Sequence, residues 1–114
     1  MKNIKLVIVD VDGVLTDGAI YIDSEGREIK AFHVLDGTGI AYLQRVGIKV
    51  AIISGRTCKA VIHRATELGI EDVYQGAKNK LDAYKEILKK YSLRDEEICY
   101  IGDDLIDLPI LYRV

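Results

Sequence analysis

The sequence predicts an α/β fold built on a doubly wound, Rossmann-like parallel sheet. Short apolar runs rich in β-branched residues recur along the chain, and segments with helical hydrophobic spacing lie between them. Near-continuous apolar runs are typical of strands that are buried on both faces of a parallel sheet. The alternation of strand and helix favours right-handed crossovers, with helices covering both faces of the sheet.

The expected elements follow one another in a regular order. Strands are predicted at 4–9, 48–53 and 97–101, with a weaker one at 71–74, and helices at 37–46, 57–69 and 79–91. The last of these helices carries a stripe suited to packing on a sheet, formed by Leu81, Tyr84, Ile87, Leu88 and Tyr91. Gly69 is placed to end the second helix, and Asp104 to open a short final one.

One segment, 19–34 (AIYIDSEGREIKAFHV), breaks this alternation. Two β-prone runs flank the turn sequence DSEG, a pattern typical of a β-hairpin. We therefore expect a hairpin flap inserted between the first strand and the first helix.

Composition and charge narrow the class of protein. With 114 residues, 49% hydrophobic content and one proline, the chain is expected to form a single domain over 1–114. A formal net charge of -2 with interspersed signs gives no electrostatic support for binding nucleic acid or a membrane surface. No apolar run is long enough to span a bilayer, and the two cysteines form no recognised motif. We expect a cytoplasmic protein with a small-molecule partner.

Polar clusters follow the predicted strands. Asp10 and Asp12 follow the first, Ser54-Gly55-Arg56 the second, and Gly102-Asp103-Asp104 with Asp107 the last. Ligands of such sheets bind outside the carboxyl ends of the strands, where these clusters converge. Crowded carboxylates repel one another unless a cation lies between them, and Mg²⁺ prefers oxygen ligands. The pattern indicates a Mg²⁺ site suited to phosphoryl transfer.

Two of the carboxylates are suited to separate chemical steps. Residues i and i+2 of an extended strand face the same side, so Asp10 and Asp12 can share one site. One aspartate can attack phosphorus to form an aspartyl-phosphate, and a second can transfer protons. Asp17 beside Gly18 fits a turn better than a metal site. Asp104 and Asp107 fit either the metal site or a helix start near it.

The motifs DVDGVLTDG, ISGR, the lysine of YQGAKNK and GDDLID, in this order, resemble those of the haloacid dehalogenase superfamily of phosphatases. The resemblance implies that Asp10 is the nucleophile, Asp12 the general acid/base, and that Asp10, Asp12 and Asp103 hold Mg²⁺. It also implies that Ser54 and Lys80 contact the phosphoryl group. Spacing alone does not separate Lys80 from Lys78.

Over essentially all 114 residues the chain is similar to the 3-deoxy-D-manno-octulosonate 8-phosphate phosphatase family, the capless branch of that superfamily. The resemblance implies hydrolysis of this sugar phosphate, on the route to lipopolysaccharide, by a homotetramer in which the hairpins meet. It implies substrate contacts at Asp12, Lys80, His33, Val34, Leu35, Asp36, Gly37, Arg56 and Arg64. Arginines suit a sugar acid that carries both a carboxylate and a phosphate.

Read from the residues alone, three of these positions have other interpretations. Arg56 could cap the sheet edge, Arg64 could lie on a solvated helix face, and His33 could pack at a subunit interface. Members of the family continue beyond the position of Val114 with a further strand, so we expect the last strand of the sheet to be missing. The chain is then a truncated portion of a longer protein, and the run 97–101 becomes an exposed apolar edge.

Competing functions remain open at this stage. Within the enzyme interpretation, the alternative substrate is a nine-carbon keto-deoxy sugar acid 9-phosphate. A receiver-like domain that accepts a phosphoryl group is a second class, and a catalytically silent assembly domain is a third. ISGR places Ser54, rather than an aspartate, after the second strand, which favours the enzyme. Arg56 in the same motif favours the eight-carbon acid through the family resemblance.

Overall fold

A parallel sheet with strand order β5-β4-β1-β6 forms the centre of the molecule in the computed structural model, which describes residues 3–102 and 105–114. Its strands are β1 (Leu6–Val9), β4 (Lys49–Ile53), β5 (Asp72–Tyr74) and β6 (Ile98–Ile101). All three pairings in this sheet are parallel. The predicted fold class is confirmed, and each strand lies within or close to its predicted range.

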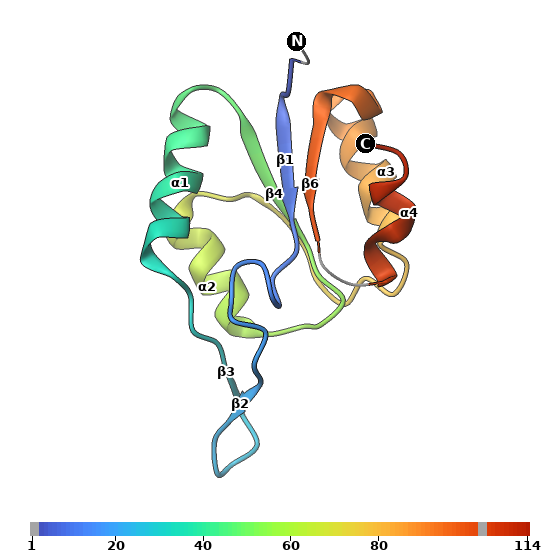
Figure 1. The fold of residues 1–114 in the computed structure, drawn as a ribbon. Helices are drawn as coiled ribbons and strands as arrows, with labels where there is room; N and C mark the ends of the chain where they lie inside the picture. Colours follow the sequence, from blue (N-terminus) through green and yellow to red (C-terminus); the bar gives the residue numbers. More distant parts are fainter. Residues whose placement is uncertain (1–2, 103–104) are drawn as a thin grey trace.

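The helices cover both faces of the sheet. They are α1 (Val34–Arg45), α2 (Lys59–Leu68), α3 (Lys80–Tyr91) and α4 (Leu108–Leu111), with short 3₁₀ turns η1 (Asp95–Glu97) and η2 (Leu105–Asp107). Figure 1 shows α1 and α2 on one side of the sheet and α3 and α4 on the other. This arrangement is the doubly wound one that the alternating sequence pattern predicts. None of the helices in the described ranges is long and apolar enough to cross a membrane.

Strand β1 supplies both halves of the core. Successive side chains of a strand point to opposite faces, so Val7 and Val9 pack with α1 and α2, and Leu6 and Ile8 pack with α3 and α4. This is why β1 has no polar residue. On α3, Tyr84 and Ile87 are buried and Leu81, Leu88 and Tyr91 pack around them, which confirms the predicted stripe.

Helix α1 begins at Val34, so the predicted start at residue 37 is wrong. The reason is that His33 caps the amino end of the helix, although histidine is not a preferred N-cap residue. Its Nδ1 accepts a hydrogen bond from the Leu35 N–H at 3.2 Å. The end of α2 agrees with the prediction. Gly69 takes the left-handed conformation, with φ of 72°, that glycine adopts without a steric penalty.

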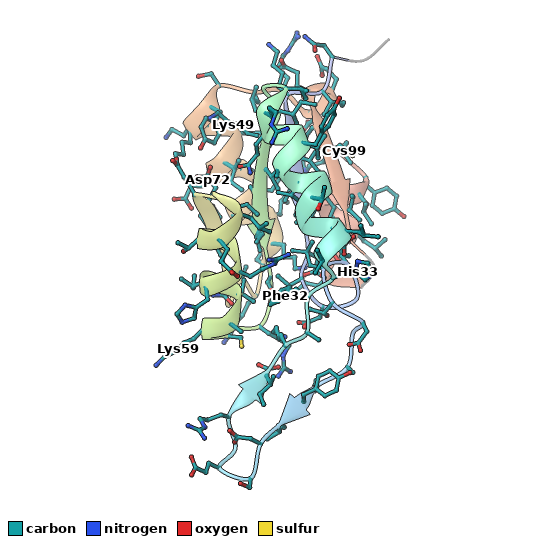
Figure 2. The ribbon with its side chains drawn as sticks, turned by 90° about the vertical axis from the view of Figure 1, so that its left-hand side faces the viewer. Phe32, His33, Lys49, Lys59, Asp72 and Cys99 are labelled. Atoms are coloured by element: carbon teal, nitrogen blue, oxygen red, sulfur yellow. The ribbon has the colours of Figure 1, made fainter. Side chains whose placement is uncertain are left out.

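The predicted hairpin is present as β2 (Tyr21–Ile22) and β3 (Glu28–Ile29), which pair antiparallel. Figures 1 and 2 show it extending away from the body, at the end of the molecule toward which β1 runs. The Asp23 carboxylate closes its turn by accepting from the N–H groups of Glu25 and Arg27.

Strand β6 forms one edge of the described sheet, and its side chains alternate between buried and exposed. Cys99 and Ile101 are exposed, in line with the expected apolar edge. Asp104, predicted to open the final helix, lies outside the described residues, and α4 itself begins at Leu108.

Candidate active site

The carboxyl ends of the strands are joined by backbone hydrogen bonds where Asp10 and Ser54 leave the sheet. The N–H of Asp10, just after β1, donates to the Ile101 carbonyl of β6 at 3.0 Å. The Ser54 N–H donates to the Tyr74 carbonyl at 2.8 Å, and the Ser54 carbonyl accepts from Ala77 at 3.0 Å. Both side chains are buried. Strand pairing therefore fixes the two residues at one edge, as their positions in the sequence predict.

Lys80 brings two carboxylates together at this edge. Its Nζ lies 3.1 Å from Oδ1 of Asp10 and 2.7 Å from Oδ1 of Asp107, and the Tyr100 hydroxyl also donates to Asp107. Lys80 is the first residue of α3, and its side chain is only 2% exposed. Lys78 is exposed, so the structure places Lys80, rather than Lys78, beside Asp10.

Burial dominates the electrostatics of Asp10. It raises the pKa of this carboxyl above its ordinary value of 3.8, against the opposing effects of the Val11 N–H, 2.8 Å away, and of Lys80. Burial, with the hydrogen bond to Asp107, also raises the pKa of Tyr100, so its hydroxyl stays a donor at neutral pH. Within the described part of the chain, the side chain of Asp10 makes its hydrogen bond with Val11 and its ion pair with Lys80 through Oδ1.

The absence of a side chain at Gly102 allows the Asp107 carboxylate and the Tyr100 ring to approach the backbone closely. A Cβ added at this residue would lie 2.5 Å from the Asp107 carboxylate and 2.8 Å from the Tyr100 ring. No side chain fits such a gap without displacing both groups. The glycine of the GDD motif is therefore required by the close approach of the residues that hold Lys80.

A second charged cluster lies between Asp12 and the hairpin. Nζ of Lys30 is 2.5 Å from Oδ1 of Asp12 and 3.4 Å from Oε1 of Glu28, and Nη2 of Arg56 is 2.8 Å from the same glutamate oxygen. Burial alone lowers the pKa of Lys30, but the pairing with Asp12, helped by Glu28, outweighs it and raises the pKa. The sequence analysis did not assign a role to Glu28 or Lys30. Their positions on either side of Ile29 in a predicted strand indicate that the two charged side chains face the same side of the hairpin.

The other residues predicted to contact substrate gather at the base of the hairpin. A hollow of about 520 Å³ is lined there by His33, Leu35 and Asp36, and Figure 2 shows His33 beside Phe32 where the hairpin joins the body. Val34 and Leu35 are exposed in the first turn of α1.

Gly37 and Arg64 lie against each other between α1 and α2. A Cβ at Gly37 would overlap the Arg64 guanidinium, which also forms an ion pair with Glu67 at 3.8 Å. Together with His33 and Asp36, the two residues line a small neighbouring hollow. The segment 33–37 and Arg64, all predicted to contact substrate, therefore lie together. In the described residues, neither forms a hydrogen bond or ion pair with Lys80, Asp10 or Asp107.

Asp17 belongs to the turn that leads into the hairpin, as predicted. Its carboxylate accepts from the Tyr21 hydroxyl at 2.7 Å and from the Ala19 N–H at 3.0 Å. These two bonds, the tyrosine first, lower the pKa of Asp17 from its ordinary value.

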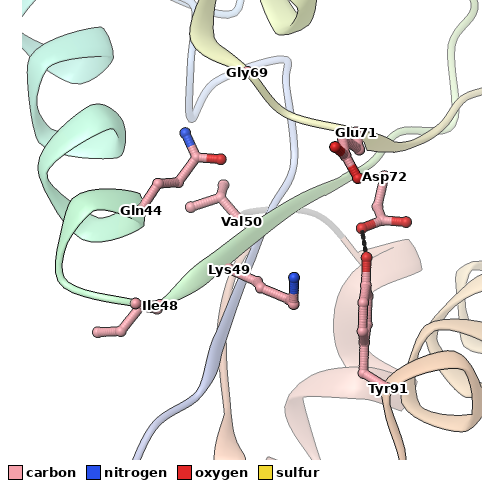
Figure 3. A pocket seen from close by; sticks show the side chains of 9 residues that line it. Gln44, Ile48, Lys49, Val50, Gly69, Glu71, Asp72 and Tyr91 are labelled. Carbon is pink, nitrogen blue, oxygen red and sulfur yellow. Dashed lines mark hydrogen bonds between the residues drawn. The ribbon is translucent and has the colours of Figure 1, made fainter.

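A different hollow, of about 270 Å³, opens at the amino ends of β4 and β5. Figure 3 shows Lys49, Asp72 and Tyr91 on its walls. Asp72 accepts hydrogen bonds from the Tyr91 hydroxyl and from Lys90, and Nζ of Lys49 lies 4.8 Å from the centre of the Tyr91 ring. The buried Asp72 carboxylate is thus satisfied by the Lys90 ammonium and the Tyr91 hydroxyl, and we infer a structural role for it.

Comparison with known proteins agrees with the geometry. Residues 30–113 match the model of the haloacid dehalogenase-like hydrolases. The chain belongs to this family. Of the motifs that carry the sequence resemblance, the structure describes Asp10, Ser54, Lys80 and Asp107 at the carboxyl edge of the sheet, whereas Asp103 and Asp104 lie outside the described residues.

The relatives of this hydrolase-family chain include enzymes with a stated substrate. The 3-deoxy-D-manno-octulosonate 8-phosphate phosphatase of Escherichia coli K12 is 50% identical over 113 residues, which cover 99% of this chain and 60% of the relative. A solved phosphatase of the same name from Yersinia pestis superposes with a TM-score of 0.97 at 50% identity, over 99% of this chain and 61% of that one. The chain thus spans about 60% of the length of the curated relatives it matches.

One solved relative was crystallised with ligands. The Moraxella catarrhalis phosphatase, in complex with magnesium, phosphate and 3-deoxy-D-manno-octulosonate (KDO), is 49% identical and superposes with a TM-score of 0.91 over 95% of this chain and 62% of that one. A Haemophilus influenzae relative, 44% identical, was solved in a cobalt-bound form.

Two oxygen donors near the carboxyl edge are of the type that a hard cation accepts. Among the described residues no group of three His, Cys, Asp or Glu side chains is arranged to hold a metal, and Asp103 and Asp104 lie outside those residues. The Asp10 carboxylate and the Asp12 carbonyl are oxygen donors of the kind that Mg²⁺ accepts. Asp107 pairs with Lys80 and precedes α4, so both of its predicted roles, beside the metal site and at a helix start, stay predictions.

Proposed function

We propose that the protein is a Mg²⁺-dependent phosphatase that hydrolyses 3-deoxy-D-manno-octulosonate 8-phosphate to KDO and phosphate, in lipopolysaccharide biosynthesis. The observation that carries the proposal is the buried Lys80, held between Asp10 and Asp107 at the edge where Ser54 also ends a strand. A buried cation beside an aspartate is suited to hold a phosphoryl group for attack. The names of the relatives point to the same reaction.

In the first half of the reaction, a carboxylate oxygen of Asp10 attacks phosphorus. The bond from phosphorus to the sugar oxygen breaks, and Asp12 gives its proton to the leaving oxygen. In the second half, Asp12 takes a proton from water, which attacks the aspartyl-phosphate and releases phosphate and Asp10. Lys80 and Ser54 bind the phosphoryl oxygens. Mg²⁺ held by Asp10, Asp12 and Asp103 would neutralise charge on the phosphoryl group.

We assign recognition of the sugar acid to the residues around the hairpin base. Arg56 and Arg64 supply guanidinium groups for carboxylate and hydroxyl oxygens, and the segment from His33 to Gly37 supplies the wall of the adjoining hollow. The ligand-bound Moraxella structure supports a site for KDO on this fold.

We also propose that the full-length protein is a homotetramer whose hairpins meet. The support is the exposure of apolar side chains on a projecting hairpin, which is unfavourable in water unless a partner covers them. These side chains are Ile20, Tyr21, Ile22 and Ile29.

The test is a side-by-side measurement of phosphate release from the eight-carbon and nine-carbon sugar acid phosphates, with Mg²⁺ and with EDTA. We expect kcat/KM at least about tenfold higher for the eight-carbon acid, a difference within reach of a few pocket contacts, and no release with EDTA. Release from neither compound contradicts the proposal. Faster phosphate release from the nine-carbon compound would show that the proposed reaction is right but that the proposed substrate is wrong.

A further inference from the structure

The second arm of the hairpin, which contains β3, places two charged side chains against residues at the carboxyl edge of the sheet. Glu28 lies in β3 and Lys30 follows two residues later, so both face one side of the arm, while Ile29 between them is exposed. Lys30 reaches Asp12, and Glu28 reaches Arg56. The hairpin therefore contacts the residues that follow β1 and β4 through a continuous chain of ion pairs.

The burial of Lys30 and Glu28 distinguishes these two residues from ordinary surface charge, whereas Arg56, at the end of the chain of ion pairs, is 49% exposed. The Lys30 side chain is 2% exposed and that of Glu28 is 16% exposed, whereas Arg27, on the outer turn of the same hairpin, is 72% exposed. Exposed ion pairs contribute little, but an ammonium taken out of water has to be matched by acceptors in a fixed geometry. The acceptors of Lys30 are Asp12 and Glu28, so the positions of these three groups are determined together.

We propose that Lys30 and Glu28 are positioning residues of the active site: Lys30 fixes the Asp12 carboxylate, and Glu28 holds Lys30 and Arg56. The inference rests on the proposed function, because it concerns the proton-transfer role of Asp12. It also gives the hairpin a second task. Besides its exposed apolar surface, the hairpin supplies part of the frame that orients the catalytic groups.

The test compares kcat and KM of full-chain variants with the eight-carbon sugar phosphate and Mg²⁺. Lys30→Met keeps the aliphatic stem but loses the cation, so we expect kcat to fall about 10- to 100-fold with KM within about twofold, an effect typical of a misplaced catalytic group. Lys30→Arg restores a cation and recovers most of the loss. Glu28→Gln loosens Arg56 and acts mainly on KM.

Arg27→Met is the matched control, because it removes an exposed cation from the same hairpin and breaks pairs with Asp23 and Glu25. It leaves kcat and KM unchanged. A wild-type kcat in Lys30→Met, or an equal loss in Arg27→Met, overturns the inference.

A structural readout separates this inference from the proposed function. If the wild-type chain releases no phosphate, the function fails, and crystal structures of the wild type and Lys30→Met then decide the positioning role. An Asp12 carboxylate that turns away in the variant supports it. An Asp12 carboxylate in an unchanged position overturns it.

Discussion

A Lys80→Met substitution removes the cation that lies between the buried carboxylates of Asp10 and Asp107. Breaking a buried ion pair by removing one partner costs about 3–5 kcal/mol. In the variant, Asp10 still accepts a hydrogen bond from the Val11 N–H, and Asp107 still accepts one from the Tyr100 hydroxyl. We therefore expect the loss of unfolding free energy to lie at the lower end of this range, at about 3 kcal/mol. If the free energy of unfolding falls by about 2 kcal/mol for each molar of urea, this loss lowers the midpoint of urea unfolding by roughly 1.5 M.

The effect of this substitution depends on pH in a definite direction. Burial raises the pKa of Asp10 above 3.8, and loss of the Lys80 charge raises it further. A carboxyl whose pKa is higher in the folded state contributes stability below its unfolded pKa and loses it as the pH rises through the folded pKa. The destabilisation is therefore larger near about pH 8 than near about pH 5.

Urea unfolding of the full chain, followed by circular dichroism at both pH values, checks the prediction. Lys78→Met is the matched control, because Lys78 is exposed and lies two residues away; its effect should stay within about 0.5 kcal/mol. Equal midpoints for wild type and Lys80→Met, or equal losses in the two variants, would refute the reasoning from the buried pair.

Three further substitutions test local features of the fold. Gly102→Ala forces a methyl group against Asp107 and should lower the free energy of unfolding by about 1–3 kcal/mol in urea melts; an unchanged midpoint argues against the close approach. The hydrogen bond from Lys5 chiefly lowers the pKa of Glu97, so its stabilisation is present above about pH 4.5 and is lost in acid. Thermal melts of Lys5→Met should therefore differ from wild type at neutral pH and converge in acid, whereas a constant gap contradicts this account. Asn79→Ala removes the cap of α3 and should cost about 1 kcal/mol, while Asn79→Asp keeps it; equal melting temperatures for both would exclude a capping role.

The strands, and the meeting of Asp10 and Ser54 at the carboxyl edge of the sheet, were predictable because their signals are local. The β1 run is apolar at every position, which a strand covered by helices on both faces requires. Parallel strands bring their carboxyl ends to one edge, so Asp10 and Ser54 could be placed from the order of the elements alone. Lys80 could be separated from Lys78 only in three dimensions, because Nζ of Lys80 lies 3.1 Å from Oδ1 of Asp10 while Lys78 is exposed.

The parts that could not be predicted depend on contacts between distant segments. The ion pair of Lys30 with Asp12 joins residues 18 positions apart across a hairpin whose angle to the body no sequence period reports. The start of α1 depends on a histidine cap, which is uncommon among helix caps, and the helical hydrophobic spacing from which the helix was predicted begins only at residue 37. In both places the outcome depends on a specific side-chain bond that residue propensity does not report.

The central claim is that Asp10 attacks the phosphoryl group at this edge, and the most direct measurement is phosphate release by Asp10→Asn in the full chain with Mg²⁺. The amide is nearly the same size as the carboxylate but is a poor nucleophile. The account predicts an unchanged circular dichroism spectrum and loss of turnover by at least about a thousandfold, the scale seen when a nucleophile is removed. Appreciable hydrolysis by a folded Asp10→Asn variant would contradict the account.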